Sequence, residues 1–239
     1  MPSLMAYSAP GVGTMAAQTR DTGLHDFVER LFGCSKEVAA SVARCAKDRF
    51  YRVRTVIVRQ GDLSGTTFLL VAGRAHALTH GCEGQFVLLH EYLPGDFFGA
   101  IAAAEPAAED ADVIAMEDVR AAVFRATDFL AMIESHGSLA VVVSRALLRQ
   151  LRAASTRVME RSTLSAAGRT HSELLRLARL GDGRTLRPAP VLSALAVRVY
   201  STRETVSRAI NGLERRGIIR REGDTLTIVA PHRLEELIV

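Results

Sequence analysis

The sequence predicts an α+β protein in which an N-terminal β-rich domain is followed by one long helix and a small C-terminal domain. Between Tyr51 and Arg125, short β-prone runs alternate with glycine turns, a spacing typical of a sandwich or barrel. From Leu139 to about Arg161, apolar residues recur at helical spacing. The residues after the long helix are predicted to form further helices followed by a β-hairpin. The 239 residues suffice for two domains with separate cores.

The N-terminal domain is expected to span residues 21–137, after a flexible tail of residues 1–20 that is rich in Ala, Gly, Ser and Met. A helical pattern runs from Asp21 to about Lys47 and is broken at Gly33. Strands are then expected at residues 53–58, 66–72, 74–79, 85–92, 113–115 and 119–124, with turns at Gly61, Gly73, Gly81 to Gly84 and Pro94 to Asp96.

The long helix, residues 138–163, carries a seven-residue repeat of apolar and small side chains. The repeat consists of Ala140, Ser144, Leu147, Leu151, Ala154 and Val158. Such a seam suits a pair of helices from two chains, and packing against the β-rich domain alone is the alternative. The repeat lapses at Thr163 to Ser165, where we expect the hinge between the domains and a cap, Ser165, for the next helix.

The C-terminal domain, residues 164–239, has the pattern of a winged helix-turn-helix. A short helix is expected from Val191 to Val199, with Pro190 at a first-turn position. After a turn at Tyr200 comes a second helix, and then two β runs within residues 217–229 that flank a Glu-Gly-Asp turn.

The second helix of this domain has one apolar face, formed by Val206, Ile210 and Leu213. Either Ser201 or Thr202 can cap it, and Ser201 with Glu204 has the spacing of a capping box.

Charged side chains lie mainly outside the apolar face. Arg203 and Arg208 can bond guanine, and Glu204 can accept from the cytosine amino group in a major groove. A plain surface helix is the alternative, but the neighbouring helix and hairpin favour DNA binding. The charge distribution also favours DNA binding, because residues 164–239 hold 13 basic and 8 acidic residues in a chain of net charge +4.

The segment from Thr202 to Arg208, Thr-Arg-Glu-Thr-Val-Ser-Arg, resembles the recognition helix of the Crp/Fnr family of transcription regulators. Gln60 to Asp62, Leu70 to Gly73 and Pro94 to Gly99 resemble landmarks of the family's cyclic-nucleotide-binding-like β-roll. The resemblance covers about residues 51–231. It implies a homodimer that reads a palindromic, TGTGA-like site in double-stranded DNA and that contacts RNA polymerase if it is an activator.

By the same resemblance, Arg203, Glu204 and Arg208 are the base-reading residues. The other DNA-binding positions that it implies are Ser201, Thr202, Thr205 and Ser207. The family usually has glycine where this chain has Tyr200, and a bulky residue at a left-handed turn position is strained.

The resemblance also implies an effector pocket between the β-roll and the long helix, from which this chain departs. Gly99 is kept, but Ala100 replaces the ribose-binding glutamate. Alignment on the following strand puts Glu109 and Asp110 at the phosphate-binding Arg–Ser pair, whereas counting straight from Ala100 puts Asp110 at the Arg position. The base-reading Thr–Ser pair becomes Ala154 and Ser155. A carboxylate in a partly desolvated pocket repels a phosphate, so we expect that cyclic AMP is not the effector.

Three uses of this degenerate pocket remain open. Side chains can fill it, which leaves a regulator that acts without a ligand. A different, non-anionic molecule can occupy the space left by the small residues Ala100, Ala102, Ala103, Ala104, Ala107 and Ala108. Haem is the third use, with His76, His80 or His90 as axial ligand. No other cofactor is expected.

Other classes of function find little support in the sequence. It has no nucleophile elbow, zinc-protease, P-loop or Rossmann motif, so no enzymatic activity is expected. Cys34, Cys45 and Cys82 lack metal-ligand spacing and do not form the cysteine cluster of the family's iron–sulfur members, so no metal site is expected. Without a transmembrane run or export signal, we expect a cytoplasmic protein with no membrane partner. The rival function is a sensing or interaction module whose DNA-binding half has degenerated.

Overall fold

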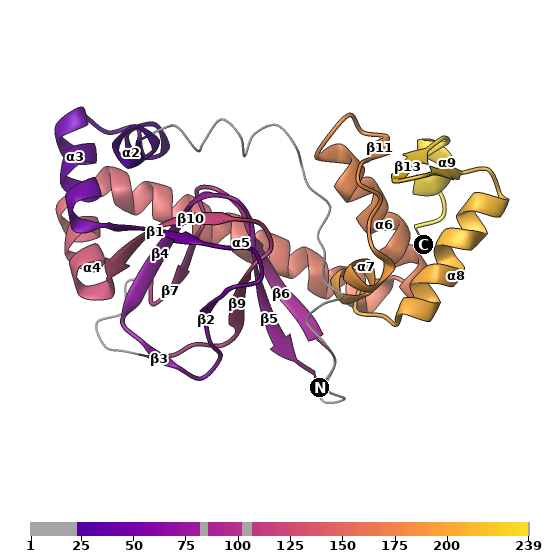
Figure 1. Ribbon diagram of the computed structural model, residues 1–239, viewed down its shortest axis with the longest axis horizontal. Coiled ribbons are helices and arrows are strands. Elements are labelled where there is room, and N and C mark those ends of the chain that lie inside the picture. The colour runs from indigo at the N-terminus through magenta and orange to yellow at the C-terminus, as the bar shows by residue number, and fades with distance from the viewer. Residues whose placement is uncertain (1–22, 82–85, 102–106, 239) are drawn as a thin grey trace. The chain divides into compact units, whose positions relative to one another are not determined.

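The computed structural model describes residues 23–81, 86–101 and 107–238, and it has the predicted α+β architecture (Figure 1). The predicted tail of residues 1–20 and most of the predicted loop from Gly81 to Gly84 lie outside the described residues. The chain forms two compact units, and the residues from Ser155 onward belong to one of them.

Two short helices, α2 (Leu24–Phe32) and α3 (Lys36–Cys45), precede the sheets. Gly33 ends α2 with a φ of 56°, the left-handed conformation that suits glycine, as its break in the pattern predicted. The predicted helical segment is too long at its end, because Lys47–Tyr51 forms strand β1 beside β10. This edge strand is mostly exposed and carries charged side chains, so it lacks the apolar alternation by which a strand is recognised.

The β-roll consists of two four-stranded sheets, in the orders β1-β10-β4-β7 and β2-β9-β5-β6, and a two-stranded ladder of β3 and β8. The strands after β1 are β2 (Val56–Val58), β3 (Leu63–Ser64), β4 (Thr66–Ala72), β5 (Ala75–His80), β6 (Phe86–Tyr92), β7 (Phe97–Gly99), β8 (Ala107–Ala108), β9 (Asp112–Ala115) and β10 (Val119–Arg125). The strand expected from residue 53 starts only at Val56, because Arg54 lies in a turn with a φ of 70°. Strands β3, β7 and β8 are two or three residues long and were not predicted.

Strand β4 contributes to two cores. Its alternate side chains Phe68 and Leu70 lie in a cluster formed by the strands of both sheets. Leu69 and Val71 point the other way, into a cluster that includes the helical residue Phe129. A strand that is buried on both faces reads as a continuous apolar run, which is the pattern seen here.

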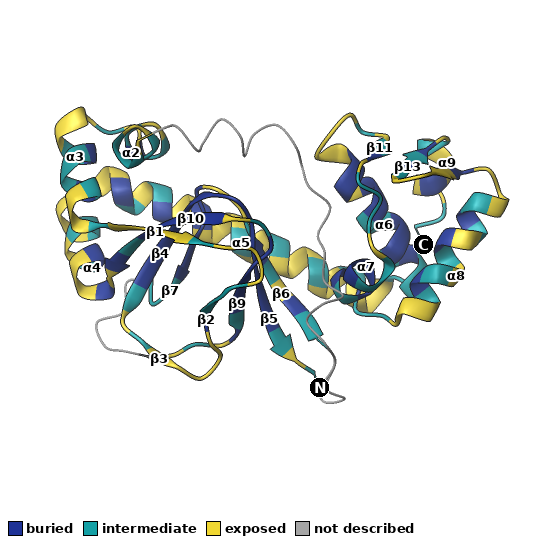
Figure 2. Ribbon diagram, viewed as in Figure 1, coloured by how far each residue is buried: buried dark blue, intermediate teal, exposed yellow. Residues whose placement is uncertain are grey.

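Helices α4 (Ala126–Ser135) and α5 (Gly137–Thr163) follow the last strand of the β-roll. Leu139, Val143 and Ala146 on one face of α5 are buried in the cluster that Leu69 and Val71 join (Figure 2). Gln150 on the same helix donates a hydrogen bond of 2.9 Å to the carbonyl of Phe97. The long helix is therefore present as predicted, and its first half packs on the β-roll.

Among the helices of the described residues, none is by itself long and apolar enough to cross a membrane. Helices α4 and α5 meet the length and composition criteria only as a pair, which is bent by 117°.

The C-terminal unit contains α6 (Ala166–Arg179), α7 (Leu192–Arg198), α8 (Arg203–Arg215) and α9 (Pro231–Glu235). Its sheet has the order β11-β13-β12, from β11 (Thr185–Leu186), β12 (Ile219–Glu222) and β13 (Thr225–Ile228). Ser165 caps α6 as predicted, since its Oγ accepts a 3.0 Å bond from the Gly168 N–H. Pro190 lies outside α7, ahead of the N-cap Val191, so its predicted place in the first helical turn is wrong.

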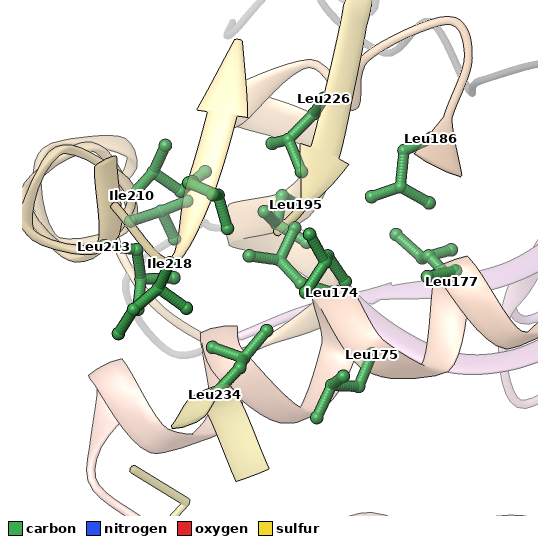
Figure 3. Packing of buried hydrophobic residues seen from close by; sticks show 14 of the residues in the cluster. Leu174, Leu175, Leu177, Leu186, Leu195, Ile210, Leu213, Ile218, Leu226 and Leu234 are labelled. Atoms are coloured by element: carbon green, nitrogen blue, oxygen red, sulfur yellow. The ribbon is translucent and has the colours of Figure 1, made fainter. Parts of the chain in front are cut away.

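Side chains from every main element of this unit meet in one core (Figure 3). Leu174 comes from α6, Leu195 from α7, Ile210 and Leu213 from α8, and Leu226 from the hairpin. The hairpin of β12 and β13 and the two helices before it form the predicted winged helix-turn-helix. Strand β11 and helix α9, which complete the unit, were not predicted.

Candidate nucleic-acid interface

Helix α8 is the candidate recognition helix, and Thr202 is its N-cap. The Thr202 Oγ1 accepts a 3.2 Å hydrogen bond from the Thr205 N–H. Of the two predicted caps the structure therefore selects Thr202. The capping box of Ser201 and Glu204 does not form, because Ser201 precedes the cap residue and lies in the turn.

The two faces of α8 differ as predicted. Val206, Ile210 and Leu213 are buried in the core of the unit. The candidate base-reading side chains Arg203, Glu204 and Arg208 are all exposed, as is Thr202, whereas Ser201, Thr205 and Ser207 are partly buried. An apolar face held in the core thus presents two cations and a carboxylate from the first two turns of the helix.

Glu204 is prepared to act as a hydrogen-bond acceptor. Its own backbone N–H and the hydroxyl of Thr202 hydrogen-bond to its carboxylate and lower the pKa of Glu204, and the charges of Arg203 and Arg208 act in the same direction. The ionised form, which can only accept, is the form that pairs with a cytosine amino group. Arg208 donates a 3.3 Å bond to the hydroxyl of Thr205, which orients its side chain along the helix.

The turn before α8 begins with a strained C-terminal cap of helix α7. The Ser201 N–H bonds the Ala196 carbonyl at 3.0 Å and the Tyr200 N–H bonds the Val197 carbonyl at 3.4 Å, the two bonds of a Schellman motif at the end of α7. This motif places Tyr200 in the left-handed region, with a φ of 52°. Glycine is the usual residue there, and a side chain at such a position costs about 1–2 kcal/mol. Tyr200 therefore adopts the left-handed conformation although it stands where the family usually has glycine.

A buried ion pair attaches α7 to α6. Arg198 Nη1 lies 3.2 Å from Glu173 Oε1, and both side chains are largely buried. Because only the three residues from Val199 to Ser201 and the N-cap separate α7 from α8, this pair also helps to fix the position of the recognition helix.

The hairpin of β12 and β13, which is the wing of this domain, and the end of α8 carry further basic residues. No motif described above includes them. Arg221 donates to Glu214 of α8 at 3.1 Å and to Asn211 at 2.9 Å, which ties strand β12 to the recognition helix. Arg215, Arg216 and Arg220 are exposed around the start of the hairpin. Their sequence signal is a pair of arginine doublets on either side of Gly217.

In the β-roll, strand β7 ends at Gly99, and Ala100 follows it directly. A Cβ atom on Gly99 would lie 2.4 Å from the Thr66 carbonyl oxygen, so this close approach requires glycine. The Ala100 N–H donates to the same oxygen at 3.0 Å. Of the other predicted pocket residues, Asp110 is exposed, and Ala154 and Ser155 are exposed on α5.

Glu109 is a partly buried carboxylate beside the β3–β8 ladder. Burial raises the pKa of Glu109, and the nearby charge of Asp110 adds to this effect against a hydrogen bond from Ser64. Within the described part of the chain, no hydrogen-bond partner reaches its buried Oε1 atom.

Aromatic rings fill the region next to Glu109. Phe98 stacks on Phe68 at a centroid distance of 4.8 Å and on Tyr92 at 4.9 Å. Burial raises the pKa of Tyr92 to about 12, and the negative charges of Glu109, Asp96 and Asp110 act in the same direction. Apart from the hydroxyls of Ser64 and Tyr92, the side chains described near Glu109 are apolar or acidic.

The histidines named as haem ligands have different surroundings. His76 is fully buried, with Nε2 3.2 Å from Glu91 Oε1, next to the buried Arg74. His90 packs its ring on Tyr92 at 4.7 Å, and His80 is exposed.

The predicted dimer seam forms an exposed apolar strip along α5. Ser144, Leu147, Leu151, Ala154 and Val158 are exposed and Ala140 is partly so. The exposed fractions of Leu151 and Val158 are 63% and 67%, high values for large apolar side chains. This strip is distinct from the face that packs on the β-roll.

Comparison with known proteins agrees with these observations. The cyclic nucleotide-binding domain family matches residues 48–136, and the Crp-like helix-turn-helix domain family matches residues 168–237. The chain is 29% identical over 189 residues to the Cyclic AMP receptor protein of Thermus thermophilus, covering 79% of this chain and 87% of that protein. It is 26% identical over 202 residues to the CRP-like cAMP-activated global transcriptional regulator of Mycobacterium tuberculosis, covering 82% and 90%.

Solved structures share the fold. FixK2 of Bradyrhizobium japonicum superposes with a TM-score of 0.69 at 20% identity, covering 81% of this chain and 98% of that one. A CooA mutant from Carboxydothermus hydrogenoformans superposes with a TM-score of 0.74 at 20% identity, covering 92% and 97%. A β-roll, a long helix and a winged helix-turn-helix with an exposed Arg–Glu–Arg set define a DNA-binding transcription regulator. The chain belongs to the Crp/Fnr family.

Proposed function

We propose that the protein acts as a homodimer that reads a palindromic, TGTGA-like DNA site through Arg203, Glu204 and Arg208. The observation that carries the proposal is the exposure of all three side chains on a helix whose opposite face is fixed in the core. Two such helices in a twofold dimer would read two half-sites in successive major grooves. The apolar strip on α5 supplies the surface for dimerisation. As is typical of the family, we expect a cytoplasmic regulator without enzymatic activity that contacts RNA polymerase if it activates.

We further propose that cyclic AMP does not control this regulator, although relatives are named for that nucleotide. A phosphate needs cationic or N–H partners, and the resemblance to the family puts Glu109 and Asp110 at the positions of its phosphate-binding pair. The stacked rings of Phe68, Tyr92 and Phe98 next to Glu109 support the idea that side chains fill this region. The protein would then act without a ligand.

A different small molecule or haem is the second candidate for control. The exposed His80 and the partly buried His90 are the histidines better placed to bind iron, because His76 is fully buried against Glu91. A sensing module without DNA binding is less well supported, since the Arg–Glu–Arg set and its buried supports are all in place.

The experiment that tests the proposal is a selection of genomic DNA fragments by the purified chain with no small molecule added. A palindromic motif with TGTGA-like half-sites is expected, together with no change in affinity when cyclic AMP is added. The Arg203→Ala protein is the matched control and should recover a motif that lacks the preference at one guanine of each half-site. If the parent protein recovers a motif only with haem or cell extract, action without a ligand is wrong. If it recovers none under any condition, DNA reading itself is wrong.

A further inference from the structure

The residues around Tyr200 connect the last turn of α5 to the turn before the recognition helix, within the C-terminal unit. The backbone at Tyr200 is in a conformation that glycine adopts more easily. A tyrosine at this position therefore calls for contacts that hold its ring or its backbone, and the structure shows both.

Arg169 on α6 holds the backbone. Its guanidinium donates to the Val199 carbonyl at 2.8 Å and to the Tyr200 carbonyl at 3.4 Å, at the C-terminal end of α7. It also donates to the Leu164 carbonyl at 2.8 Å, directly after α5 ends. The planar guanidinium of Arg169 thus hydrogen-bonds backbone carbonyls that follow both α5 and α7.

Arg161 holds the ring. Its guanidinium carbon lies 5.3 Å from the centroid of the Tyr200 ring, within the range of a cation–π contact. Arg161 belongs to the last turn of α5, which is also attached to α6, because the Ser172 hydroxyl donates to Glu160 at 2.8 Å. Glycine at position 200 could not make the ring contact.

We propose that Tyr200, Arg161 and Arg169 form a lock that fixes the start of the recognition helix to the end of α5. Tyr200 is then a positioning residue rather than a tolerated replacement for glycine. The hinge expected at Thr163 to Ser165 is spanned by these contacts, so the last turn of α5 moves together with the DNA-reading helix. The expected effect of the lock on DNA binding rests on the proposed function. The contacts that form the lock do not depend on that function.

The first test measures amide hydrogen exchange in the full chain without DNA. The Ser201 amide closes the Schellman motif, and the Leu164 amide bonds Glu160 at the end of α5. In Tyr200→Gly and in Arg161→Met, both amides should exchange at least about tenfold faster, while the Ile210 amide in the core of α8 stays protected. Tyr200→Phe loses the hydroxyl that donates to the Leu88 carbonyl but keeps the ring contact with Arg161, so both amides should exchange like those of the parent protein. If Tyr200→Gly slows exchange at Ser201, relief of backbone strain is the only effect and the lock is wrong.

The second test measures the spacing of half-sites. A fixed recognition helix should discriminate against an operator with one base pair inserted between its half-sites. Tyr200→Gly and Arg161→Met should bind the parent operator about tenfold more weakly and lose most of that discrimination, with the preferred bases unchanged. The double variant should lose no more than either single variant. Additive losses, or unchanged discrimination, would overturn the proposal. Changed base preferences in these variants would instead count against the assignment of the base-reading residues.

Discussion

At the scale of single residues, the candidate interface consists of side chains whose backbone is fixed by buried neighbours. Arg203, Glu204 and Arg208 are exposed, while Val206 and Ile210 on the same helix are buried. Loss of an exposed side chain should therefore change DNA reading without changing the fold. Loss of a buried one should destabilise the unit and, through it, weaken DNA reading.

Arg203→Ala tests base reading at one position. The variant should bind its site more weakly by about 1–3 kcal/mol and lose its preference at one guanine, because a bidentate contact is removed. Binding to parent and substituted sites by fluorescence anisotropy measures both effects. Arg220→Ala on the wing is the control, and it should weaken binding to all sequences alike. Unchanged preference in Arg203→Ala would refute the assignment.

Glu109 gives a prediction about pH. Its folded-state pKa is raised above the ordinary value of 4.5, so its ionisation disfavours the folded state once the pH rises above that value. Glu109→Gln should therefore increase the free energy of unfolding near pH 7 and have little effect near pH 4, as urea denaturation would show. Asp110→Asn removes only the smaller repulsion that Asp110 adds, so it should increase the free energy of unfolding near pH 7 by less than Glu109→Gln does. A Glu109→Gln protein that is less stable near pH 7 would contradict this account.

At the scale of elements, α5 has two separate apolar surfaces. Leu139, Val143 and Ala146 pack on the β-roll, whereas Leu147, Leu151 and Val158 remain exposed. Exposed large apolar residues at seven-residue spacing along one helix are typical of a surface that a second chain covers.

Leu151→Glu tests the seam. A buried carboxylate in a helix pair is costly, so the variant should sediment as a monomer and lose tight binding to a palindromic site. Arg145→Glu changes charge at an exposed position next to the seam and should leave the dimer intact. An unchanged dimer in Leu151→Glu would show that chains associate elsewhere or through other residues.

Elements were predictable from the sequence where a period or a special residue marks them. The long repeat marks α5, the apolar triad of Val206, Ile210 and Leu213 marks α8, and Gly33 marks the end of α2. Strands β3, β8 and β11 have two residues each, too few for a period, and β1 is an exposed edge strand. The stacking of Tyr92 on Phe98 and the Arg169 contacts depend on tertiary structure, so no local pattern predicts them.

At the scale of the whole molecule, charge is concentrated where DNA is expected to bind. The chain has a net charge of +4, and residues 164–239 alone hold 13 basic and 8 acidic residues. Phosphate contacts release counterions, so binding should weaken steeply as salt rises.

Salt dependence measures how many arginines contact phosphates. Arg215→Ala and Arg220→Ala should each reduce the slope of log affinity against log salt by about 1, because each removes one cation from the exposed surface of the wing and helix end. Arg145→Glu on α5 is the control and should leave the slope unchanged. If neither the Arg215→Ala nor the Arg220→Ala substitution changes the slope, the phosphate contacts lie elsewhere.

The two surfaces of α5 also determine how the chain tolerates insertions. Each residue turns an α-helix by about 100°, so one residue inserted between Ala146 and Leu151 rotates the exposed strip relative to the buried face. Seven inserted residues restore the phase to within about 20° while lengthening the helix by about 10 Å. Natural or engineered variants of this protein should therefore differ in α5 length by whole heptads. Insertion or deletion of a single residue there should destabilise the protein or its dimer as much as the loss of a core side chain.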